Sequence, residues 1–347
     1  MRVEARAPAR VDLAGGTVDI WPLYLFHPGA QTVNLAIRCY ASCVIETRPD
    51  RQIALISKDQ DIRETFEDLA DLVRGKSRLP LVRELVVFFE PHRGLNIETS
   101  SQVPAGAGLG GSSALNIALC GGLARVTGKR VTRTQILEIA KNVEAIVIRV
   151  PTGWQDYFPA LYGGANVIHL GADGVKRERL PVFVSDLEKR FVLCYTGQPR
   201  DSAINNWEVM KSHIDGEEQV RRNFDKITTI ASQMREALLT GDWKDVAELL
   251  ASEWENRKQN FKGISTPTID NMIEETKKQG TVAAKVCGAG GGGCVVFMVE
   301  PGTKPAVEEA LTQMGGQIIN FAFSRTGLEV WADQPERAQE DPEKNLP

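Results

Sequence analysis

The stretch Gln102-Val-Pro-Ala-Gly-Ala-Gly-Leu-Gly-Gly-Ser-Ser-Ala114 decides the fold of this chain. An alternating apolar run at 94–101 predicts a strand before it, and a helix rich in small residues is expected from Ser112 to about Val126. Glycines allow positive φ and let a ligand approach the backbone closely. Free N–H groups at the start of a helix favour an anion, and the serine hydroxyls can bind phosphate or Mg²⁺. The stretch therefore predicts a phosphate-binding loop.

Other interpretations of this loop compete with that one. Gly106-x-Gly108-x-x-Gly111 matches the dinucleotide-binding fingerprint, but the acidic residue expected about 20 positions later is missing from 128–133. A Walker A loop is excluded because no lysine follows the glycines. A turn that merely packs a helix closely on a strand stays open from these residues alone.

The rest of the chain predicts a mixed α+β protein. Its 347 residues exceed what one hydrophobic core usually fills, so two domains are expected, at 1–185 and 186–332. Helical periodicity is nearly continuous over 203–279, whereas strand patterns dominate the first hundred residues. Because strands and helices do not alternate regularly, a doubly wound sheet is not expected. Residues 333–347 are highly charged with little apolar content, which predicts a flexible tail.

The composition argues against several classes of partner. Net charge is −4, so no strong basic field would attract nucleic acid or an anionic membrane. Apolar runs such as 294–299 are far shorter than the ~18–20 residues that span a membrane, and the charged N-terminus predicts no secretory signal. The six cysteines form no C-x-x-C motif, which predicts reduced thiols and a cytoplasmic protein. The sequence leaves the oligomeric state open, a homodimer included.

Three motifs resemble those of the GHMP kinases, a superfamily that includes galactokinase, homoserine kinase and mevalonate kinase. The central loop is similar to the signature that wraps the ATP phosphates in that family, Ala7–Asp19 resembles the first motif and Lys285–Cys294 the third. The three motifs follow one another in the family's order over nearly the whole chain. The resemblance implies an N-terminal domain of the ribosomal-protein-S5 type, a ferredoxin-like C-terminal domain, an active site between them, and ATP and Mg²⁺ as cofactors.

The resemblance also implies roles for individual residues. Asp156, which ends Gly153-Trp-Gln-Asp156, matches the catalytic aspartate, and Arg10 is its expected cationic partner. A carboxylate here can accept the proton of the acceptor hydroxyl. Glu144 is the expected metal ligand together with Ser112, with Ser113 as the alternative serine. The residues expected to bind the ATP phosphates are Pro104, Gly106, Gly108, Leu109, Gly110, Gly111, Ser112 and Ser113.

The acceptor is expected to bind beside Arg10 and Asp19. Asp19 matches an aspartate that binds sugar hydroxyls in galactokinase, but the Gly15-Gly16 form of the loop is closer to the heptose-phosphate kinase and fucokinase branch. Arg200 is expected to hold a substrate phosphate, with a loop salt bridge as the alternative. The full set expected to bind substrate is Arg10, Gly15, Gly16, Thr17, Asp19, Asp156, Arg200, Gly290 and Gly291.

Together these residues predict an ATP-dependent kinase for a sugar or sugar phosphate, such as a heptose 7-phosphate, acting on a hydroxyl expected to be anomeric. One alternative keeps the fold but changes the acceptor to an isoprenoid, an inositol or an amino-alcohol. The other is a catalytically silent sensor that binds sugar and ATP. Asp19 argues against an apolar acceptor, and the presence of Asp156 and Glu144 argues against a silent sensor.

Overall fold

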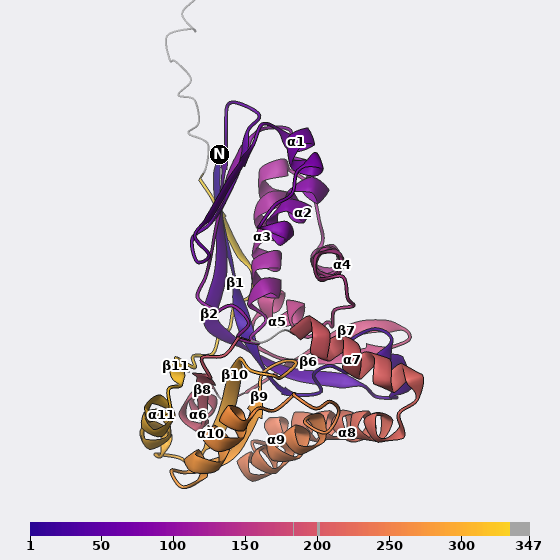
Figure 1. The fold of residues 1–347 in the computed structure, drawn as a ribbon, viewed down its shortest axis with the longest axis vertical. Helices are drawn as coiled ribbons and strands as arrows, with labels where there is room; N and C mark the ends of the chain where they lie inside the picture. Colours follow the sequence, from indigo (N-terminus) through magenta and orange to yellow (C-terminus); the bar gives the residue numbers. More distant parts are fainter. Residues whose placement is uncertain (183, 200–201, 334–347) are drawn as a thin grey trace, which may run out of the picture.

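The computed structural model describes residues 1–182, 184–199 and 202–333. The predicted tail, apart from its first residue, and Arg200 therefore lie outside the described residues. Two sheets and the helices packed on them build an elongated molecule, with the long strands of the first sheet running down its axis (Figure 1).

The N-terminal part is built on an eight-stranded sheet. Its main path runs β12-β1-β2-β5-β3-β4, while β6 pairs with β2 and β7 pairs with β6. The strands are β1 (Arg2–Ala14), β2 (Gln31–Thr47), β3 (Ile53–Ser57), β4 (Ile62–Phe66), β5 (Leu95–Ser101), β6 (Ala165–Gly171), β7 (Gly174–Leu180) and β12 (Glu329–Ala332).

The long strands β1 and β2 are not uniform along their length, because β2 changes its pairing partner and the register between the two strands shifts. The Ala41–Thr47 part of β2 pairs with β5, whereas its Gln31–Leu35 part pairs with β6. The register between β1 and β2 shifts after Pro8 and again after Asp12, and such shifts bend a strand. Arg10 therefore lies between two irregularities, near the place where the sheet divides.

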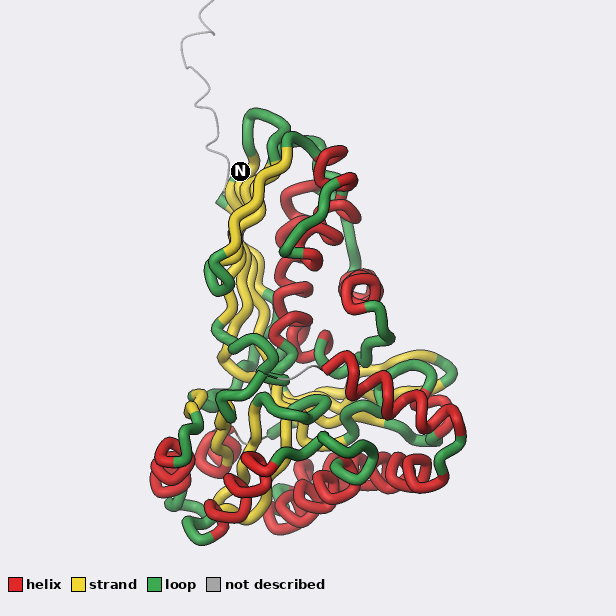
Figure 2. Tube along the Cα trace, in the orientation of Figure 1, coloured by secondary structure: helices red, strands yellow, loops and turns green. Residues whose placement is uncertain are grey.

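Helices cover one face of the upper part of this sheet (Figure 2). The central helix α3 packs directly on β1 and β2, and α2, α4 and α5 pack around it. Its small residues Ala114, Ala118, Gly121 and Gly122 are fully buried, which lets the helix lie close to the strands. The helices of this part are η1 (Leu23–Phe26), α1 (Leu69–Arg74), α2 (Pro80–Phe89), α3 (Gly111–Thr127), α4 (Arg133–Ile148) and α5 (Tyr157–Tyr162).

The C-terminal part is built on a four-stranded antiparallel sheet in the order β11-β8-β10-β9. Its strands are β8 (Phe191–Tyr195), β9 (Thr281–Val286), β10 (Cys294–Val299) and β11 (Gln317–Ile319). Its helices are α6 (Val184–Arg190), α7 (Ser202–Asp215), α8 (Glu218–Thr240), α9 (Trp243–Arg257), α10 (Pro267–Lys277) and α11 (Lys304–Gln313).

The two parts share a hydrophobic core. Val11 and Leu35 of the first sheet lie in one buried cluster with Leu250 of α9 and Val296 of β10. The chain also crosses back, because β12 pairs with the beginning of β1. The two parts are therefore consecutive in the sequence but share a core and a strand pairing in the structure. The domain limits at 185 and 332 stay a prediction.

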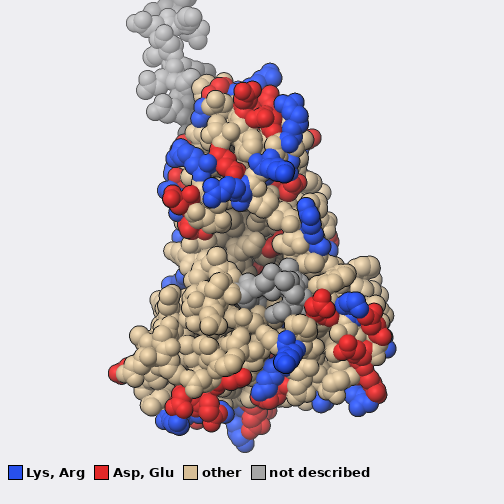
Figure 3. Space-filling model, in the orientation of Figure 1, with Lys and Arg blue, Asp and Glu red and all other residues tan. Residues whose placement is uncertain are grey.

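The surface carries charges of both signs. On the face shown in Figure 3, acidic and basic side chains mix at the two ends, and the hollow between the ends shows few charges. This distribution agrees with the small net charge of −4. Within the described residues, no helix has both the length and the apolar character needed to cross a membrane.

Candidate active site

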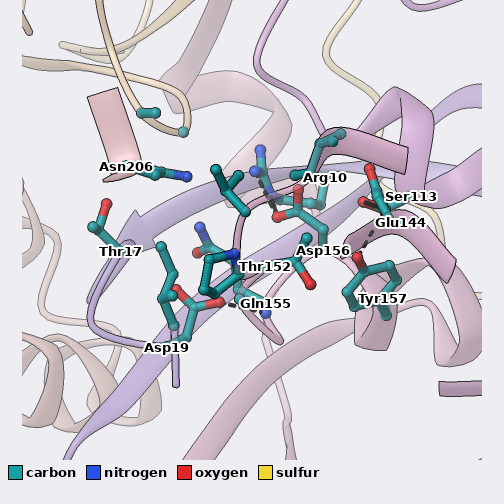
Figure 4. Close-up of a pocket in the computed structure, with 17 residues that line it drawn as sticks. Arg10, Thr17, Asp19, Ser113, Glu144, Thr152, Gln155, Asp156, Tyr157 and Asn206 are labelled. Carbon is teal, nitrogen blue, oxygen red and sulfur yellow. Dashed lines mark hydrogen bonds and ion pairs between the residues drawn. The ribbon is translucent and has the colours of Figure 1, made fainter. Parts of the chain in front are cut away.

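Two clefts open beside α3 and meet at three side chains. The inner cleft, of about 100 Å³, is lined by residues such as Arg10, Thr17 and Asp19 (Figure 4). The loop cleft, of about 400 Å³, runs along the glycine loop 104–113 toward the start of α2. The residues that line both clefts are Ser113, Glu144 and Asp156.

The glycine loop leaves the start of α3 open for a ligand. Gly106, Gly108 and Gly110 have φ values of 70°, 78° and 69°, a region that other residues enter only with strain. Gly110 is the N-cap of α3 and no side chain bonds the first N–H groups of the helix. Because those groups lack a side-chain cap, the start of α3 is able to accept an anion from the loop cleft.

The second glycine loop, 288–293, packs against the first one. A Cβ atom on Gly293 would lie only 2.7 Å from the carbonyl oxygen of Ala107, so no larger residue fits there. The N–H of Cys294 donates to that same oxygen at 2.7 Å. The C-terminal sheet is therefore fastened, backbone to backbone, to the loop that precedes α3.

Arg10 and Asp156 form an ion pair at the junction of the clefts. The Nε and Nη2 atoms of Arg10 lie 2.8 and 2.7 Å from Oδ1 of Asp156, and Nη1 donates to the carbonyl oxygen of Gly108 at 2.6 Å. Burial alone would lower the pKa of Arg10, but the charges of Asp156 and Asp12 raise it above its ordinary value. The guanidinium thus stays charged and holds Asp156 beside the glycine loop.

Glu144, on α4, is buried next to the start of α3. One of its oxygens accepts hydrogen bonds from the hydroxyls of Ser113 and Tyr157, both at 2.8 Å. Burial, and after it the charge of Asp156, raise the pKa of Glu144, whereas hydrogen bonds from the hydroxyls of Tyr157, Ser113 and Ser112 oppose that rise. A bound divalent cation would supply a counter-charge to this buried carboxylate.

The donor atoms of this neighbourhood, a carboxylate and serine hydroxyls, are of the kind that bind Mg²⁺. Within the described ranges, no three His, Cys, Asp or Glu side chains cluster closely enough to hold a metal ion. Mg²⁺ is commonly held by one or two carboxylates, with water and substrate phosphates completing its coordination. Glu144 and the exposed hydroxyl of Ser112, beside the loop cleft, match that requirement.

Asp19 and Thr17 form one wall of the inner cleft. Asp19 is almost fully buried, and its Oδ2 accepts a hydrogen bond from the N–H of Gln155 at 2.8 Å. Burial raises the pKa of Asp19 to about 6, although the Gln155 N–H opposes the rise. Thr17 has φ of 72°, which is rare for a β-branched residue, and such strain is often found at functional sites.

Most residues predicted for the site meet at these clefts. Leu109 is buried instead, and its carbonyl oxygen accepts the N–H of Arg10. Gly290 and Gly291 pack against Ile264. The predicted residues that line a cleft are Arg10, Thr17, Asp19, Pro104, Gly106, Gly108, Gly110, Gly111, Ser112, Ser113, Glu144 and Asp156. Gly15 and Gly16 are not part of the lining: Gly15 packs against the backbone of Gln31, and Gly16 against the Arg257 side chain.

Several lining residues were not foreseen from the sequence. Gly288 and Ala289 face the inner cleft from the second glycine loop, and Asn206 faces it from α7. Tyr157 directly follows Asp156, so its position next to the predicted catalytic residue was an available signal. The far end of the loop cleft was also missed, and its lining includes Ser57, Asp59, Arg78, Leu79, Pro80, Thr99 and Ser101.

Comparison with known families decides between the interpretations that the sequence left open. A model of the GHMP kinases N terminal domain matches residues 79–164, and a model of the GHMP kinases C terminal matches residues 234–317. The chain belongs to the GHMP kinases. As a member of this family it is an ATP-dependent phosphotransferase. The family match favours a phosphate-binding loop over a dinucleotide fingerprint, and the roles of the individual loop residues stay a prediction.

Relatives of this GHMP kinase act on different acceptors. The D-glycero-alpha-D-manno-heptose 7-phosphate kinase of Campylobacter jejuni is 27% identical over 95% of this chain and 98% of that protein. A mevalonate kinase of Thermococcus sibiricus is 27% identical over the same shares. The L-fucokinase/L-fucose-1-P guanylyltransferase of Bacteroides fragilis is 26% identical over 94% of this chain but only 38% of its own length.

Solved structures confirm the two-domain GHMP kinase fold. A D-glycero-D-manno-heptose 1-phosphate kinase from Bacteroides thetaiotaomicron gives a TM-score of 0.77 at 24% identity, covering 96% of this chain and 100% of that one. Lactococcus lactis galactokinase complexed with galactose gives 0.79 at 19% identity, covering 94% and 95%. At these identities the similarity shows the fold.

Proposed function

We propose that this GHMP kinase transfers the terminal phosphoryl group of ATP to a hydroxyl, the anomeric one, of a sugar or sugar phosphate such as a heptose 7-phosphate. The observation that carries the proposal is the place of Asp156, which lines both clefts and pairs with Arg10. A carboxylate at such a junction can orient the hydroxyl of an acceptor in one cleft toward a phosphoryl group in the other.

The loop cleft is the proposed ATP site. The open start of α3 and the glycine loop would hold the phosphates, and the far end near Leu79 and Pro80 offers apolar surface to the adenosine. Glu144, with Ser112 or Ser113, would hold Mg²⁺. The ion, when bound, neutralises charge on the phosphate oxygens.

Arg10 and Asp156 act as a unit in this proposal. Arg10 fixes the carboxylate through two nitrogen atoms and also holds the Gly108 carbonyl, so the proton acceptor keeps a constant position relative to the phosphate loop. Asp156 then takes the proton of the acceptor hydroxyl as the new O–P bond forms. The positive guanidinium compensates the two negative groups that approach each other.

The inner cleft is the proposed acceptor site, and its lining is polar. Asp19, Thr17 and the amides of Gln155 and Asn206 can exchange hydrogen bonds with several hydroxyls. Each buried polar group left without a partner would cost about 1–3 kcal/mol, so an isoprenoid chain is a poor occupant. The heptose-phosphate kinase and fucokinase relatives support a sugar acceptor.

A mevalonate-type acceptor is the second candidate, because mevalonate kinases match the chain at similar identity. Mevalonate carries a carboxylate and hydroxyls, so it would also use polar contacts. It offers fewer hydroxyl groups to the inner cleft than a sugar does.

A cytoplasmic location and a homodimer complete the proposal. All six cysteines are buried, and burial raises the pKa of Cys39 to about 11 and of Cys43 to about 12, which suits thiols that stay reduced. Light scattering on the purified protein tests the dimer.

A panel of acceptors tests the proposed function. ADP release is measured with ATP and Mg²⁺ against D-glycero-D-manno-heptose 7-phosphate, heptose 1-phosphate, L-fucose, galactose and mevalonate. Turnover with at least one sugar or sugar phosphate is expected, and the product is assigned by ³¹P NMR. Turnover with mevalonate alone would establish the second candidate, while saturable sugar binding without any turnover would identify a sensor.

A further inference from the structure

Beneath the inner cleft lies a buried charge cluster, formed by Asp12, Glu253, Arg257 and Lys285. Asp12, Glu253 and Lys285 are 0% exposed and Arg257 is 2% exposed. Two acids and two bases balance, so the cluster carries no formal net charge. The members come from β1, α9 and β9, which belong to both parts of the molecule.

The cluster encloses Gly288, the first residue of the second glycine loop. Oδ1 of Asp12 accepts the N–H of Gly288 at 2.9 Å, and Nη1 of Arg257 donates to the Gly288 carbonyl oxygen at 3.2 Å. Both backbone polar groups of this residue are therefore held by the cluster. Gly288 itself lines the inner cleft.

Lys285 forms an ion pair with Asp12, and this is why it is not expected to bind a ligand. Its ammonium lies 2.6 Å from Oδ2 of Asp12 and donates to the Asp12 carbonyl oxygen at 3.0 Å. A lysine just before a glycine loop would by position suggest a phosphate contact. Because this one is fully buried against a carboxylate, its charge is already neutralised.

Two further parts of the site rest on the same cluster. Arg10 lies two residues before Asp12 on β1, with its Nη1 3.9 Å from Oδ1 of Asp12. Gly16 belongs to residues 15–17, which we call the acceptor loop. A Cβ atom on Gly16 would lie 2.7 Å from Arg257 Nη2 and 2.9 Å from Asp12 Oδ2, so this loop packs directly on both side chains. The charge cluster thus contacts three parts of the site: Arg10 of the Arg10–Asp156 pair, the acceptor loop and the second glycine loop.

We propose that Asp12 is a positioning residue: its hydrogen bond to Gly288 fixes the second glycine loop relative to Arg10 and the acceptor loop. The proposal rests on the proposed kinase function and adds a residue that touches neither substrate. Asp12 acts through Gly288, while Lys285 neutralises Asp12 so that the carboxylate can stay buried in its charged form. A displacement of about 1 Å at such a distance from the chemistry can cost about 10²-fold in rate.

A purely structural role makes a different prediction. Replacing a buried ion pair by apolar side chains of similar volume is often neutral for stability. A cluster retained only for packing would therefore tolerate any charge-balanced replacement with little change in kcat. A positioning role requires that the acceptor for the Gly288 N–H be kept.

Two charge-balanced double variants separate these roles. Asp12→Asn/Lys285→Met removes both charges but keeps a side-chain oxygen for Gly288, whereas Asp12→Leu/Lys285→Met is nearly isosteric and offers none. The ion pairs Arg10–Asp156 and Arg257–Glu253 remain complete in both variants. Each variant is checked by near-UV circular dichroism and thermal denaturation before its kinetics are measured.

The kinetic expectation is a split between the two variants. The Asp12→Asn/Lys285→Met form is expected to lose less than about threefold in kcat, and the Asp12→Leu/Lys285→Met form about 30- to 100-fold, with the dissociation constant of a non-hydrolysable ATP analogue little changed in either. Equal kcat values in the two folded variants, whether high or low, would overturn the positioning role of the Gly288 bond.

An exchange measurement on the unaltered protein covers the case in which a variant fails to fold. Amide hydrogen exchange followed by NMR is expected to show a strongly protected N–H at Gly288, compared with the exposed Gly302 as reference. Exchange of Gly288 as fast as that of Gly302 would refute the bond to Asp12. This result does not depend on turnover, so it separates a failure of the positioning role from a failure of the proposed function.

Discussion

Asp156 is held on one side by Arg10 and is open on the other to both clefts. In this arrangement the Asp156 side chain can act in two separate ways. It can accept the proton of the acceptor hydroxyl, and it can stabilise the local structure through its hydrogen bonds with Arg10. Asparagine has the same size and keeps an oxygen for Arg10, so it removes the first contribution with little effect on the second.

Asp156→Asn is therefore expected to lower kcat by about 10²-fold or more while leaving the affinity for ATP nearly intact. Steady-state kinetics and titration with a non-hydrolysable ATP analogue measure the two effects. Asp173→Asn, in the exposed turn between β6 and β7, is the matched control. A kcat close to that of the unaltered protein would mean that Asp156 only shapes the site.

Glu144→Gln is expected to raise the Mg²⁺ concentration needed for half-maximal activity by about tenfold or more. The amide keeps the size of the side chain but cannot neutralise the ion, and even residues around metal ligands contribute 10- to 100-fold to affinity. Glu138→Gln, on the solvent-exposed side of the same helix, is the control. An unaltered Mg²⁺ dependence would exclude Glu144 as a ligand.

Asp19 is expected to make acceptor binding depend on pH. Its folded pKa of about 6 lies above the ordinary value, so the carboxyl is protonated below that pH and ionised above it. An ionised carboxylate accepts stronger hydrogen bonds from hydroxyls, so the KM of an uncharged sugar should fall as pH rises through about 6. The transition should disappear in Asp19→Asn; its persistence there would assign the titration to another group.

The residues expected to be catalytic were easier to predict from the sequence than those that line the acceptor site. Arg10, Glu144 and Asp156 lie in motifs whose spacing resembles the family, and the structure brings them together. Asn206 reaches the inner cleft from α7 only because the second part of the chain folds over the first, and no local pattern indicates that contact. Residues joined by tertiary packing alone leave no periodic signal in the sequence.

Secondary structure followed local patterns where one face of an element is apolar. The predicted helix after the glycine loop is α3 (Gly111–Thr127), and the predicted strand at 94–101 is β5 (Leu95–Ser101). β7 (Gly174–Leu180) was missed because its exposed, charged sequence shows no apolar alternation. α5 (Tyr157–Tyr162) was missed because Pro159 suggests a break, although proline is tolerated in the first turn of a helix.

The α4 helix offers a test of local stability away from the chemistry. Thr132 accepts the N–H of Gln135, and the Gln135 side chain accepts the N–H of Thr132, which forms a capping box. Thr132→Ala should lower the free energy of unfolding by about 1 kcal/mol. Urea denaturation measures the loss, and the Mg²⁺ dependence should not change because Glu144 lies at the opposite end of the helix. No loss of stability would show that water replaces the cap without cost.

Across the whole molecule, a pair of histidines joins elements from both parts. Nε2 of His27, just after η1, lies 2.8 Å from Nε2 of His213 on α7, and Nδ1 of His27 lies 2.7 Å from Asp225 on α8. Burial, and then the neighbouring His27 and Arg221, lower the pKa of His213 to about 4. Protonation of His213 is therefore opposed in the folded state.

Stability should consequently decrease in mild acid. The unfolded chain binds a proton at His213 near pH 6.5 and the folded chain only near pH 4, so the contribution is complete above about 6.5 and is lost as pH falls toward about 4. Thermal denaturation across that range should show a smaller slope for His213→Asn than for the unaltered protein. His92→Asn, at an exposed position, should keep the original slope. An unchanged slope for His213→Asn would place the acid sensitivity elsewhere.

The return of β12 to β1 also bears on how the protein is made. Arg6 and Glu329, which are hydrogen-bonded across these strands, are 323 residues apart in the sequence. At translation rates of about 5–20 residues per second, β1 leaves the ribosome roughly 15 to 65 s before its outer neighbour exists. For that time the nascent chain carries a bare strand edge, which is a template for pairing with other chains. Synthesis that stalls just before codon 329 should therefore release an aggregation-prone product.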